Sequence, residues 1–326
     1  MNRSLAVLLV LLVAVLAAGV FLGETTLTSA QFAQAFRDPD SLPGEVLWAI
    51  RAPRAATAAV VGAALGLAGA ALQGLLRNPL ADPGVLGVSA SSGLGAAVAI
   101  AAGLAAVPGA IEGAALGGAL VAGVLVVGLA ARFREPETLI LFGVSLSAFA
   151  GALTALVFNL SPSPVSTTEI LGWLLGSAAN RDWTDVAHSL IPMAAGAVLI
   201  AYAGRGLVML TLGEETAAMS GLPMARLRTA AVAGAALLSG AAVAAAGVIG
   251  FVGLAAPHLV RRGVGDDPQA ALLPSAVAGA ILLTAADLAA RMLQTEQELK
   301  LGVVTALFGA PLFALVAWRA ARSWRT

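Results

Sequence analysis

The sequence predicts an all-α membrane protein, and composition and apolar patterning both lead there. Of the 326 residues, 59% are hydrophobic and only 11% are charged, which leaves too little polar surface to coat a water-soluble globule. In a bilayer core every backbone N–H and C=O must bond within the protein, so only helices or a closed barrel can span it. The apolar runs are rich in Ala and Leu and lack period-two alternation, which indicates helices.

Ten apolar windows are expected as helices of one transmembrane domain covering residues 1–326. They lie near residues 5–22, 55–76, 87–107, 112–131, 138–160, 186–208, 229–249, 251–260, 270–293 and 302–318. The first window could also be a signal peptide. Its run of about eighteen apolar residues exceeds the usual ~7–15 of a signal peptide and is long enough to span, so we expect a retained helix.

The stretch from Thr229 to Val260 is too long for one crossing. About 32 helical residues would measure nearly 48 Å at about 1.5 Å each, against a hydrocarbon core of ~30 Å. Gly247, Gly250 and Gly253 supply a weak point, because glycine costs a helix about 1 kcal/mol relative to Ala. We therefore expect a full span followed by a short helix that returns toward the first face.

The distribution of positive charge predicts that both termini are cytoplasmic. With ten crossings, twelve arginines fall inside: Arg3, Arg77, Arg132, Arg134, Arg205, Arg226, Arg228, Arg261, Arg262, Arg319, Arg322 and Arg325. Six basic residues fall outside: Arg37, Arg51, Arg54, Arg181, Arg291 and Lys300. This asymmetry agrees with the enrichment of Lys and Arg in cytoplasmic loops.

Two matching segments suggest an inverted internal repeat. Thr57–Leu65 and Thr229–Leu237 agree at eight of nine positions, and each follows an arginine by three residues. In the topology above they run in opposite directions, as in the inverted repeats of transporters, although Ala-rich helices also match by chance. Two further spacings, Gly62-x-x-x-Gly66 and Gly113-x-x-x-Gly117, are of the kind that lets helix backbones approach closely.

Composition also excludes several kinds of site. Lys300 is the only lysine, and no Gly-rich turn is followed by Lys and Ser/Thr, so the chain cannot hydrolyse ATP through a phosphate-binding loop. The net charge is zero and the arginines are scattered, so the sequence lacks the basic patch that nucleic-acid binding needs. Cysteine is absent, which removes disulfides, thiolate metal sites and thiol nucleophiles. We expect no cofactor and no metal site.

Two alternatives to a passive passage need groups that the predicted helices mostly lack. An ion-coupled carrier needs ionisable residues deep in the membrane, and an intramembrane enzyme needs a converging acid, base or nucleophile. Asp287 lies toward the outer end of its span and Glu112 at a helix start. Of the two histidines, we expect His258 to be structural, and His188, near the outer end of its helix, could contact a haem-like cargo.

Two cytoplasmic loops carry turn and capping signals. The loop Arg77–Gly84, with two prolines and a glycine, predicts a tight and ordered turn. The segment Gly213–Pro223 predicts a short amphipathic helix bounded by helix breakers. It is either a connector lying on the membrane or a helix offered to a cytoplasmic partner, and in the second case it resembles the Glu-Ala-Ala…Gly coupling loop of ABC-transporter permeases.

Two more stretches carry a resemblance to one family. Gly250–His258 (GFVGLAAPH) and Gly302–Phe313 (GVVTALFGAPLF) resemble signatures of the FecCD-type permeases, which import iron chelates, haem and cobalamin. With Arg51–Arg54, the loop at 78–83 and Ala286–Arg291, the resemblance covers nearly the whole chain from residue 45. Lys300 stands where this family more usually has a proline.

The resemblance implies a homodimeric importer permease of the bacterial inner membrane, with ten helices per subunit and a central path along the twofold axis. Two cytoplasmic ATP-binding cassette subunits would use the ATP, and a periplasmic or lipid-anchored binding protein would deliver the cargo. The permease itself would not be an enzyme. We expect an iron chelate, siderophore or haem, as cargo, with cobalamin as the alternative within the family.

The resemblance also implies roles for particular positions. Arg51, Arg54 and Arg291 match outer-face arginines that meet acidic residues of the binding protein, although Arg291, four residues after Asp287, could also form a helical ion pair. Asn78 and Leu80 match a gate at the cytoplasmic end of the path. The coupling segment would be 211–226, with contacts to the ATPase from Glu214, Glu215, Thr216, Ala217, Ala218, Gly221 and Leu222.

Overall fold

The computed structural model describes residues 3–133, 136–161, 163–293 and 299–323, and within these ranges every regular element is helical. Most of the chain lies in long helices: α1 (Arg3–Phe21), α4 (Ala52–Leu76), α5 (Val88–Ala101), α6 (Ala110–Arg132), α7 (Pro136–Leu160), α9 (Trp183–Leu210), α11 (Met224–Ala246), α12 (Val252–Val264), α13 (Pro268–Met292) and α14 (Leu301–Ser323). Shorter elements connect them: α2 (Ser29–Arg37), α3 (Leu42–Gly44), the π-helix η1 (Glu45–Arg51), the 3₁₀ turns η2 (Pro83–Leu86) and η3 (Leu104–Ala106), α8 (Pro164–Leu174) and α10 (Glu214–Met219).

Among the described residues, seven helices are long and apolar enough to cross a membrane: α1, α4 with the segment before it, α6, α7, α9, α11 and α13. Two shorter apolar helices accompany them, α5 and the stretch Leu301–Pro311 of α14. The helix expected at 87–107 ends at Ala101, because Gly103 adopts a left-handed backbone conformation. Gly109, on the other side of η3, adopts one as well. The helices α2, α3, η1 and α8 were not predicted from the sequence.

The predicted break after the span from Thr229 is found. The helix α11 ends at Ala246, Gly247 adopts φ 73°, and the chain resumes as α12 at Val252. Phe251, which is not a glycine, also has a positive φ of 68°. The second helix runs to Val264, four residues beyond the expected end at Val260, because the next left-handed glycine is Gly265.

Close backbone contact holds α4 against α13. A Cβ atom added to Gly62 would lie 2.2 Å from the carbonyl oxygen of Gly279, and one added to Gly66 would lie 2.2 Å from that of Ser275. Any larger side chain would push the two helices apart, as the spacing of Gly62 and Gly66 predicts. The spacing of Gly113 and Gly117 does not have this role within the described residues, since a Cβ atom added at either position would meet no atom of another helix within 4 Å.

The two matching segments occupy equivalent places at the centre of the bundle. Thr57 is the sixth residue of α4 and Thr229 the sixth of α11, and the two helices pack against each other. They are also the most buried spans, with 72% and 83% of their apolar windows inside the molecule. Each is followed by a short helix, α5 after α4 and α12 after α11, so the likeness extends to the order and length of the elements.

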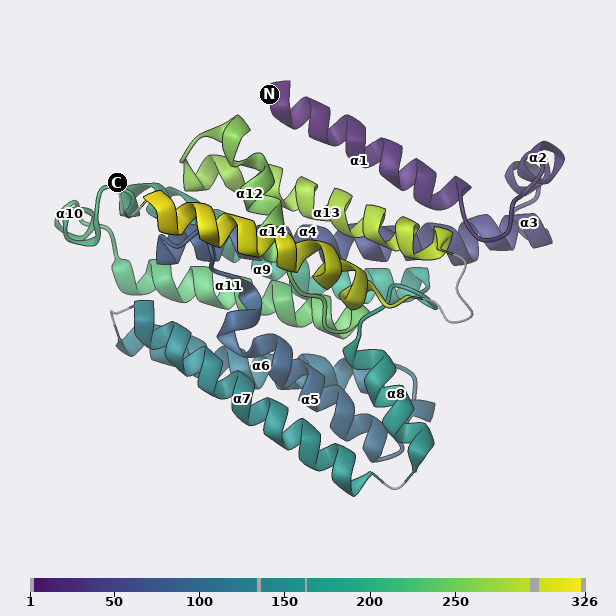
Figure 1. Ribbon diagram of the computed structural model, residues 1–326, viewed down its shortest axis with the longest axis horizontal. Coiled ribbons are helices and arrows are strands. Elements are labelled where there is room, and N and C mark those ends of the chain that lie inside the picture. Colours follow the sequence, from purple (N-terminus) through teal and green to yellow (C-terminus); the bar gives the residue numbers. More distant parts are fainter. Residues whose placement is uncertain (1–2, 134–135, 162, 294–298, 324–326) are drawn as a thin grey trace.

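The helices run roughly along the long axis of the molecule (Figure 1). The short helix α10 lies at one end of that axis, where α14 also finishes, and α2 and α3 lie at the opposite end. By contrast with α4 and α11, α7 has only 11% of its apolar window buried, and α1 has 6%. The fold is therefore a tight centre of α4, α11 and α13 with weakly buried helices around it.

Candidate functional site

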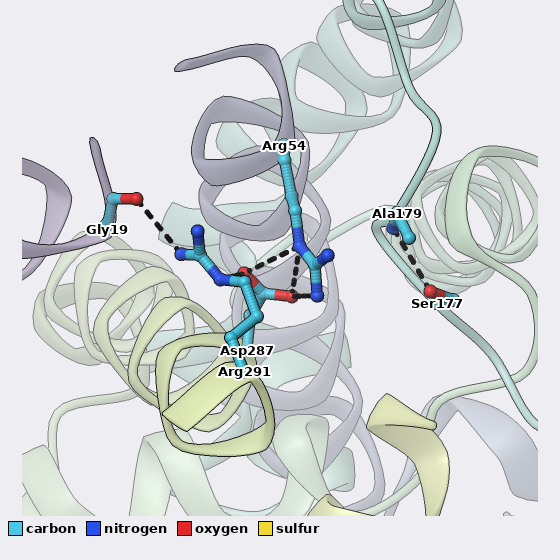
Figure 2. Close-up of polar contacts among 6 residues, drawn as sticks. All are labelled: Gly19, Arg54, Ser177, Ala179, Asp287 and Arg291. Carbon is cyan, nitrogen blue, oxygen red and sulfur yellow. Dashed lines mark hydrogen bonds and ion pairs between the residues drawn. The ribbon is translucent and has the colours of Figure 1, made fainter. Parts of the chain in front are cut away.

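One carboxylate gathers two arginines at the end of α4 and α13. The Arg54 guanidinium contacts Oδ1 of Asp287 through Nη2 at 2.8 Å and Nε at 2.9 Å, as Figure 2 shows. Arg291 Nε lies 3.1 Å from Oδ2 of the same Asp287, one helical turn away. The predicted helical ion pair between Asp287 and Arg291 is therefore present, and Asp287 is fully buried.

The same end of the bundle holds the last turn of α1. Arg291 Nη2 donates to the carbonyl oxygen of Gly19 at 3.0 Å. Arg51 donates to the carbonyl oxygens of Phe21 at 3.2 Å and Thr25 at 2.5 Å. The last carbonyls of a helix lack partners within the helix and carry partial negative charge, so these two cations stabilise its end.

These contacts differ from the expectation of charges presented on an outer face. Arg51 and Arg291 are each only 5% exposed, and the Arg54 side chain is 12% exposed. All three guanidinium groups are engaged within the chain, and they join α1, α4 and α13. Sequence reasoning missed this because the carbonyl oxygens of α1 carry no sequence signal.

The turn containing Asn78 and Leu80 is ordered as predicted from its prolines and glycine. Arg77 takes a left-handed conformation at the end of α4, with φ 48°. The side-chain Oδ1 of Asn78 accepts from the backbone N–H of Leu80 at 2.9 Å. A cavity of about 320 Å³ lies between this turn and the start of α13, and Asn78 lines it whereas Leu80 does not.

Two residues that the sequence analysis did not single out pack this turn against α12. Asp82 Oδ1 accepts from the N–H of Gly84 at 2.8 Å, and its Oδ2 lies near Gly253. Burial raises the pKa of the Asp82 carboxyl, and the hydrogen bond from Gly84 opposes that shift. Gln73, a buried amide in α4, places Nε2 at 3.4 Å from the carbonyl oxygens of Ala81 and Gly253. The sequence signal available for Gln73 was a polar side chain inside an otherwise apolar helix.

The segment expected to contact an ATPase forms α10 between α9 and α11. Its Ala217 is buried, and Leu222 N–H donates back to the carbonyl of Ala217 at 3.2 Å, with Gly221 left-handed between them. The exposed residues of α10 are Glu215, Thr216, Ala218 and Met219. The helix therefore has one side packed on the bundle and one side open.

An ion pair ties α10 to the membrane helices. Glu214, in the first turn of α10, pairs with Arg228 in the first turns of α11. Arg228 is buried, and its Nη1 also lies 3.4 Å from the carbonyl oxygen of Phe133 at the end of α6. In the sequence Arg228 counted only as a cytoplasmic positive charge, since nothing in its spacing marked Glu214, fourteen positions earlier, as its partner.

The two histidines lie apart. His258 is partly buried in α12, directly after Pro257, and His188 is exposed near the beginning of α9. The part of the chain that the structure describes contains no group of three or more His, Asp or Glu side chains arranged to hold a metal ion.

Comparison with known proteins gives the family context of these elements. The model of the FecCD transport family matches residues 9–319. An uncharacterized ABC transporter permease protein, YvrB of Bacillus subtilis strain 168, is 39% identical over 295 residues, covering 88% of this chain and 82% of its own length. The vitamin B12 import system permease protein BtuC of Escherichia coli O157:H7 is 36% identical over 283 residues, covering 85% and 84%.

The fold has a solved counterpart of the same length. A metal-chelate type ABC transporter in an inward-facing conformation superimposes with a TM-score of 0.86 at 32% identity, covering 97% of this chain and 98% of its own. Permease subunits of this family lack an ATPase site themselves, and they are multi-pass proteins of the bacterial inner membrane. With a family match over nearly its whole length, this chain belongs to the FecCD transport family of ABC transporter permeases.

Proposed function

We propose that this permease carries a metal chelate into the cytoplasm by alternating access, with an iron chelate such as a siderophore or haem as the cargo. The observation that carries the proposal is the match to the FecCD family over residues 9–319, supported by the likeness to a metal-chelate type transporter. Cobalamin is the second candidate, which the similarity to the vitamin B12 permease BtuC favours.

The cargo can be identified through the cognate binding protein. We expect that protein to co-purify with one ligand class, and a ferric siderophore, haem and cobalamin differ in their visible absorption spectra. Reconstituted transporter should then take up that ligand and not the other two. A binding protein that carries none of the three would contradict the proposed substrate class.

We propose that the chain works as a homodimer. The wide exposed face of α7 supports this, because large apolar side chains such as Leu141, Val144, Phe149 and Leu156 are exposed on a helix that is hardly buried. In the described part of a single subunit, α14 also exposes the large apolar side chains of Leu307 and Phe308. Mass determination of the purified permease in detergent tests this, with two chains per particle expected.

We propose ten crossings with both termini in the cytoplasm: α1, α4, α5, α6, α7, α9, α11, α12, α13 and α14. The short helices α5 and α12, of 14 and 13 residues, would extend about 20 Å at 1.5 Å per residue, less than the ~30 Å core. Short helices at equivalent places in two halves are typical of inverted-repeat transporters. Because the chain has no cysteine, single introduced cysteines can map each loop by accessibility to impermeant reagents.

We propose that two cytoplasmic ATPases bind at α10, using the exposed residues Glu215, Thr216 and Ala218. The coupling segment 211–226 supports this, because α10 lies at one end of the molecule with an open side (Figure 1). The purified permease alone should hydrolyse no ATP, and hydrolysis should depend on added ATPase subunits. Rapid hydrolysis by this chain alone would contradict the proposal.

We propose that Asn78 and Leu80 form part of a gate at the same end. An ordered turn supports this proposal. The N–H of Leu80 donates to Asn78 Oδ1, and the contacts of Gln73 and Asp82 hold the turn against α12.

We also propose that the binding protein docks over the cluster of Arg51, Arg54 and Arg291. Arg54 and Arg291 share the carboxylate of Asp287, and within the described part of the chain Arg51 binds only backbone carbonyl oxygens and a hydroxyl. The cluster therefore keeps a formal excess of positive charge for acidic residues of a partner.

A further inference from the structure

A second cavity lies at the end of the bundle where α6 and α9 begin, and it has a volume of about 240 Å³. Its floor consists of small and apolar side chains from α6 and α11. Its rim is charged. The rim residues are Glu112, Arg181, Asp185 and His188, and the floor includes Leu116, Ala241, Ala244 and Ala245.

The cavity sits at the edge of a surface suited to lipid. After Leu116, α6 exposes Leu120 and Val124, and after His188, α9 exposes Ile191 and Val198. The helix faces that line the cavity therefore continue as apolar surface along both helices. Trp183, the first residue of α9, is 52% exposed and donates Nε1 to the carbonyl oxygen of Trp48 at 2.9 Å. Tryptophans are enriched where the acyl chains meet the headgroups, so the charged rim lies at headgroup level.

The rim offers both a cation and several acceptors. Arg181 Nη1 donates to Glu112 Oε1 at 2.6 Å, while Arg181 Nε is buried without a hydrogen-bond partner in the described part of the chain. The guanidinium therefore keeps donor capacity after pairing with Glu112. Pro192 has no N–H, so it cannot donate the usual helical hydrogen bond to the carbonyl oxygen of His188. That oxygen and the carboxylates of Glu112 and Asp185 are the acceptors.

We propose that this cavity binds the headgroup of a phosphatidylethanolamine lipid. The phosphate would lie at Arg181, and the primary ammonium would donate to Glu112, Asp185 and the carbonyl oxygen of His188. The inference needs only that α6 and α9 span the membrane, and it does not depend on the identity of the transported cargo.

Charge and size select this headgroup over others. The formal charges of Glu112, Asp185 and Arg181 sum to minus one, which disfavours an anionic phosphoglycerol headgroup. A choline headgroup has no N–H to donate to the acceptors. A volume of about 240 Å³ is below the ~300–1,000 Å³ of sites for drug-sized ligands, so the cavity suits a headgroup better than a metal chelate.

The preference can be measured on the full-length permease in detergent. Phosphatidylethanolamine, phosphatidylcholine and phosphatidylglycerol with identical acyl chains are titrated in, and retained lipid is counted by native mass spectrometry. We expect phosphatidylethanolamine to bind about tenfold more tightly than the other two, the scale of one hydrogen bond to a charged group. Equal retention of the three, or tighter binding of phosphatidylglycerol, would overturn the proposal.

Matched variants localise the preference to this cavity. Asp185→Asn removes an acceptor for the ammonium and should reduce the preference to less than about twofold, the affinity ratio of a few tenths of a kcal/mol. Asp40→Asn, at an exposed carboxylate outside the cavity, should keep the preference, and Glu112→Gln provides a second variant if Asp185→Asn does not fold. Arg181→Gln removes the partner of the phosphate, which all three lipids carry, and should weaken the binding of all three, whereas Arg205→Gln, at an exposed position in the last two turns of α9, should not. A preference unchanged in Asp185→Asn and Glu112→Gln, or displacement of the lipid by haem, siderophore or cobalamin, would show that the cavity is not a headgroup site.

Discussion

Arg54 and Asp287 lie 233 positions apart in the sequence and form an ion pair in which two guanidinium nitrogens contact the same carboxylate oxygen, at 2.8 and 2.9 Å. Asp287 also pairs with Arg291, which in turn contacts α1 through Gly19. The carboxylate is fully buried. Because a buried charge is costly to desolvate, the main effect of the ion pair is to hold the helices in register. It fixes the ends of α1, α4 and α13 relative to one another.

Asp287→Ala should therefore destabilise the fold strongly. The substitution leaves Arg54 and Arg291 without the carboxylate that they share, and removing one partner of a buried ion pair costs about 3–5 kcal/mol. Denaturant unfolding of the full-length chain in detergent measures the loss. Asp40→Ala, at an exposed carboxylate on the same end of the molecule, should change stability by less than about 0.5 kcal/mol. Equal losses in the two variants would refute the bracing role of Asp287.

Much of the fold was predictable because lipid imposes simple rules. The length and apolar composition of the spans predicted the long helices, and the glycines after residue 246 predicted the break near Gly247. The length of α5 was not predictable, because Ala102–Val107 is as apolar as the helix before it and only the left-handed glycines end it. The short helices α2 and α8 carry ordinary polar and capping residues, which signal a helix start but not its place in the fold.

The site was predictable in part, and the limit has a physical cause. Spacing of four residues was enough to pair Asp287 with Arg291. The contacts of Arg51 with Phe21 and Thr25, and of Arg228 with Phe133, use backbone carbonyl oxygens. Every residue has such an oxygen, so no pattern in the sequence identifies the acceptor. Only the packing of distant helices does.

Two glycines in similar spacings should respond in opposite ways to alanine. In Gly62→Ala the new methyl group would lie 2.2 Å from the carbonyl oxygen of Gly279, so we expect a loss of about 1–3 kcal/mol from overpacking. A Cβ atom added to Gly113 would meet no other described helix within 4 Å, and Gly113→Ala should gain up to about 1 kcal/mol from helix propensity. Unfolding midpoints of the two variants in the same detergent measure both effects. A destabilised Gly113→Ala would indicate a contact that one subunit does not contain.

Asp82 should make stability depend on pH in a defined direction. Burial raises its pKa in the folded state, so the folded chain binds more protons than the unfolded chain, and stability falls as the pH rises. The fall should begin near the ordinary Asp pKa of about 3.9 and end above the raised value. Asp82→Asn keeps an oxygen to accept from Gly84 N–H and should remove this contribution.

Thermal unfolding between about pH 4 and pH 7 compares the two proteins. Asp266→Asn, at an exposed acid on the wall of the cavity that Asn78 lines, is the control and should keep the slope of the unmodified chain. If the unmodified chain and Asp82→Asn have the same slope, the Asp82 carboxyl does not titrate with folding.

The proposed docking of the binding protein should depend on Arg51. Arg51→Gln removes the charge, and its shorter side chain also removes the Nη donors to the carbonyl oxygens of Phe21 and Thr25. The association rate of the binding protein should fall severalfold and lose part of its salt dependence, because charge at an interface acts mainly on encounter. Surface-captured permease and binding protein at increasing salt give both quantities. Arg37→Gln, at an exposed arginine on the same end of the molecule, should have the smaller effect, and the reverse order would reject Arg51 as a docking residue.

The ion pair between Glu214 and Arg228 should couple ATP hydrolysis to transport. It joins α10 to α11, and Arg228 also reaches the end of α6 at Phe133, so a movement of α10 would be passed to two membrane helices. Arg228→Ala should lower the amount of cargo moved per ATP in proteoliposomes containing the ATPase subunits, while Glu215→Ala, at an exposed neighbour, should leave that ratio unchanged. Exchanging the charges in Glu214→Arg with Arg228→Glu should restore the ratio in part, which a merely structural defect would not do. If the exchange is no better than Arg228→Ala alone, the pair holds α10 in place without transmitting its movement.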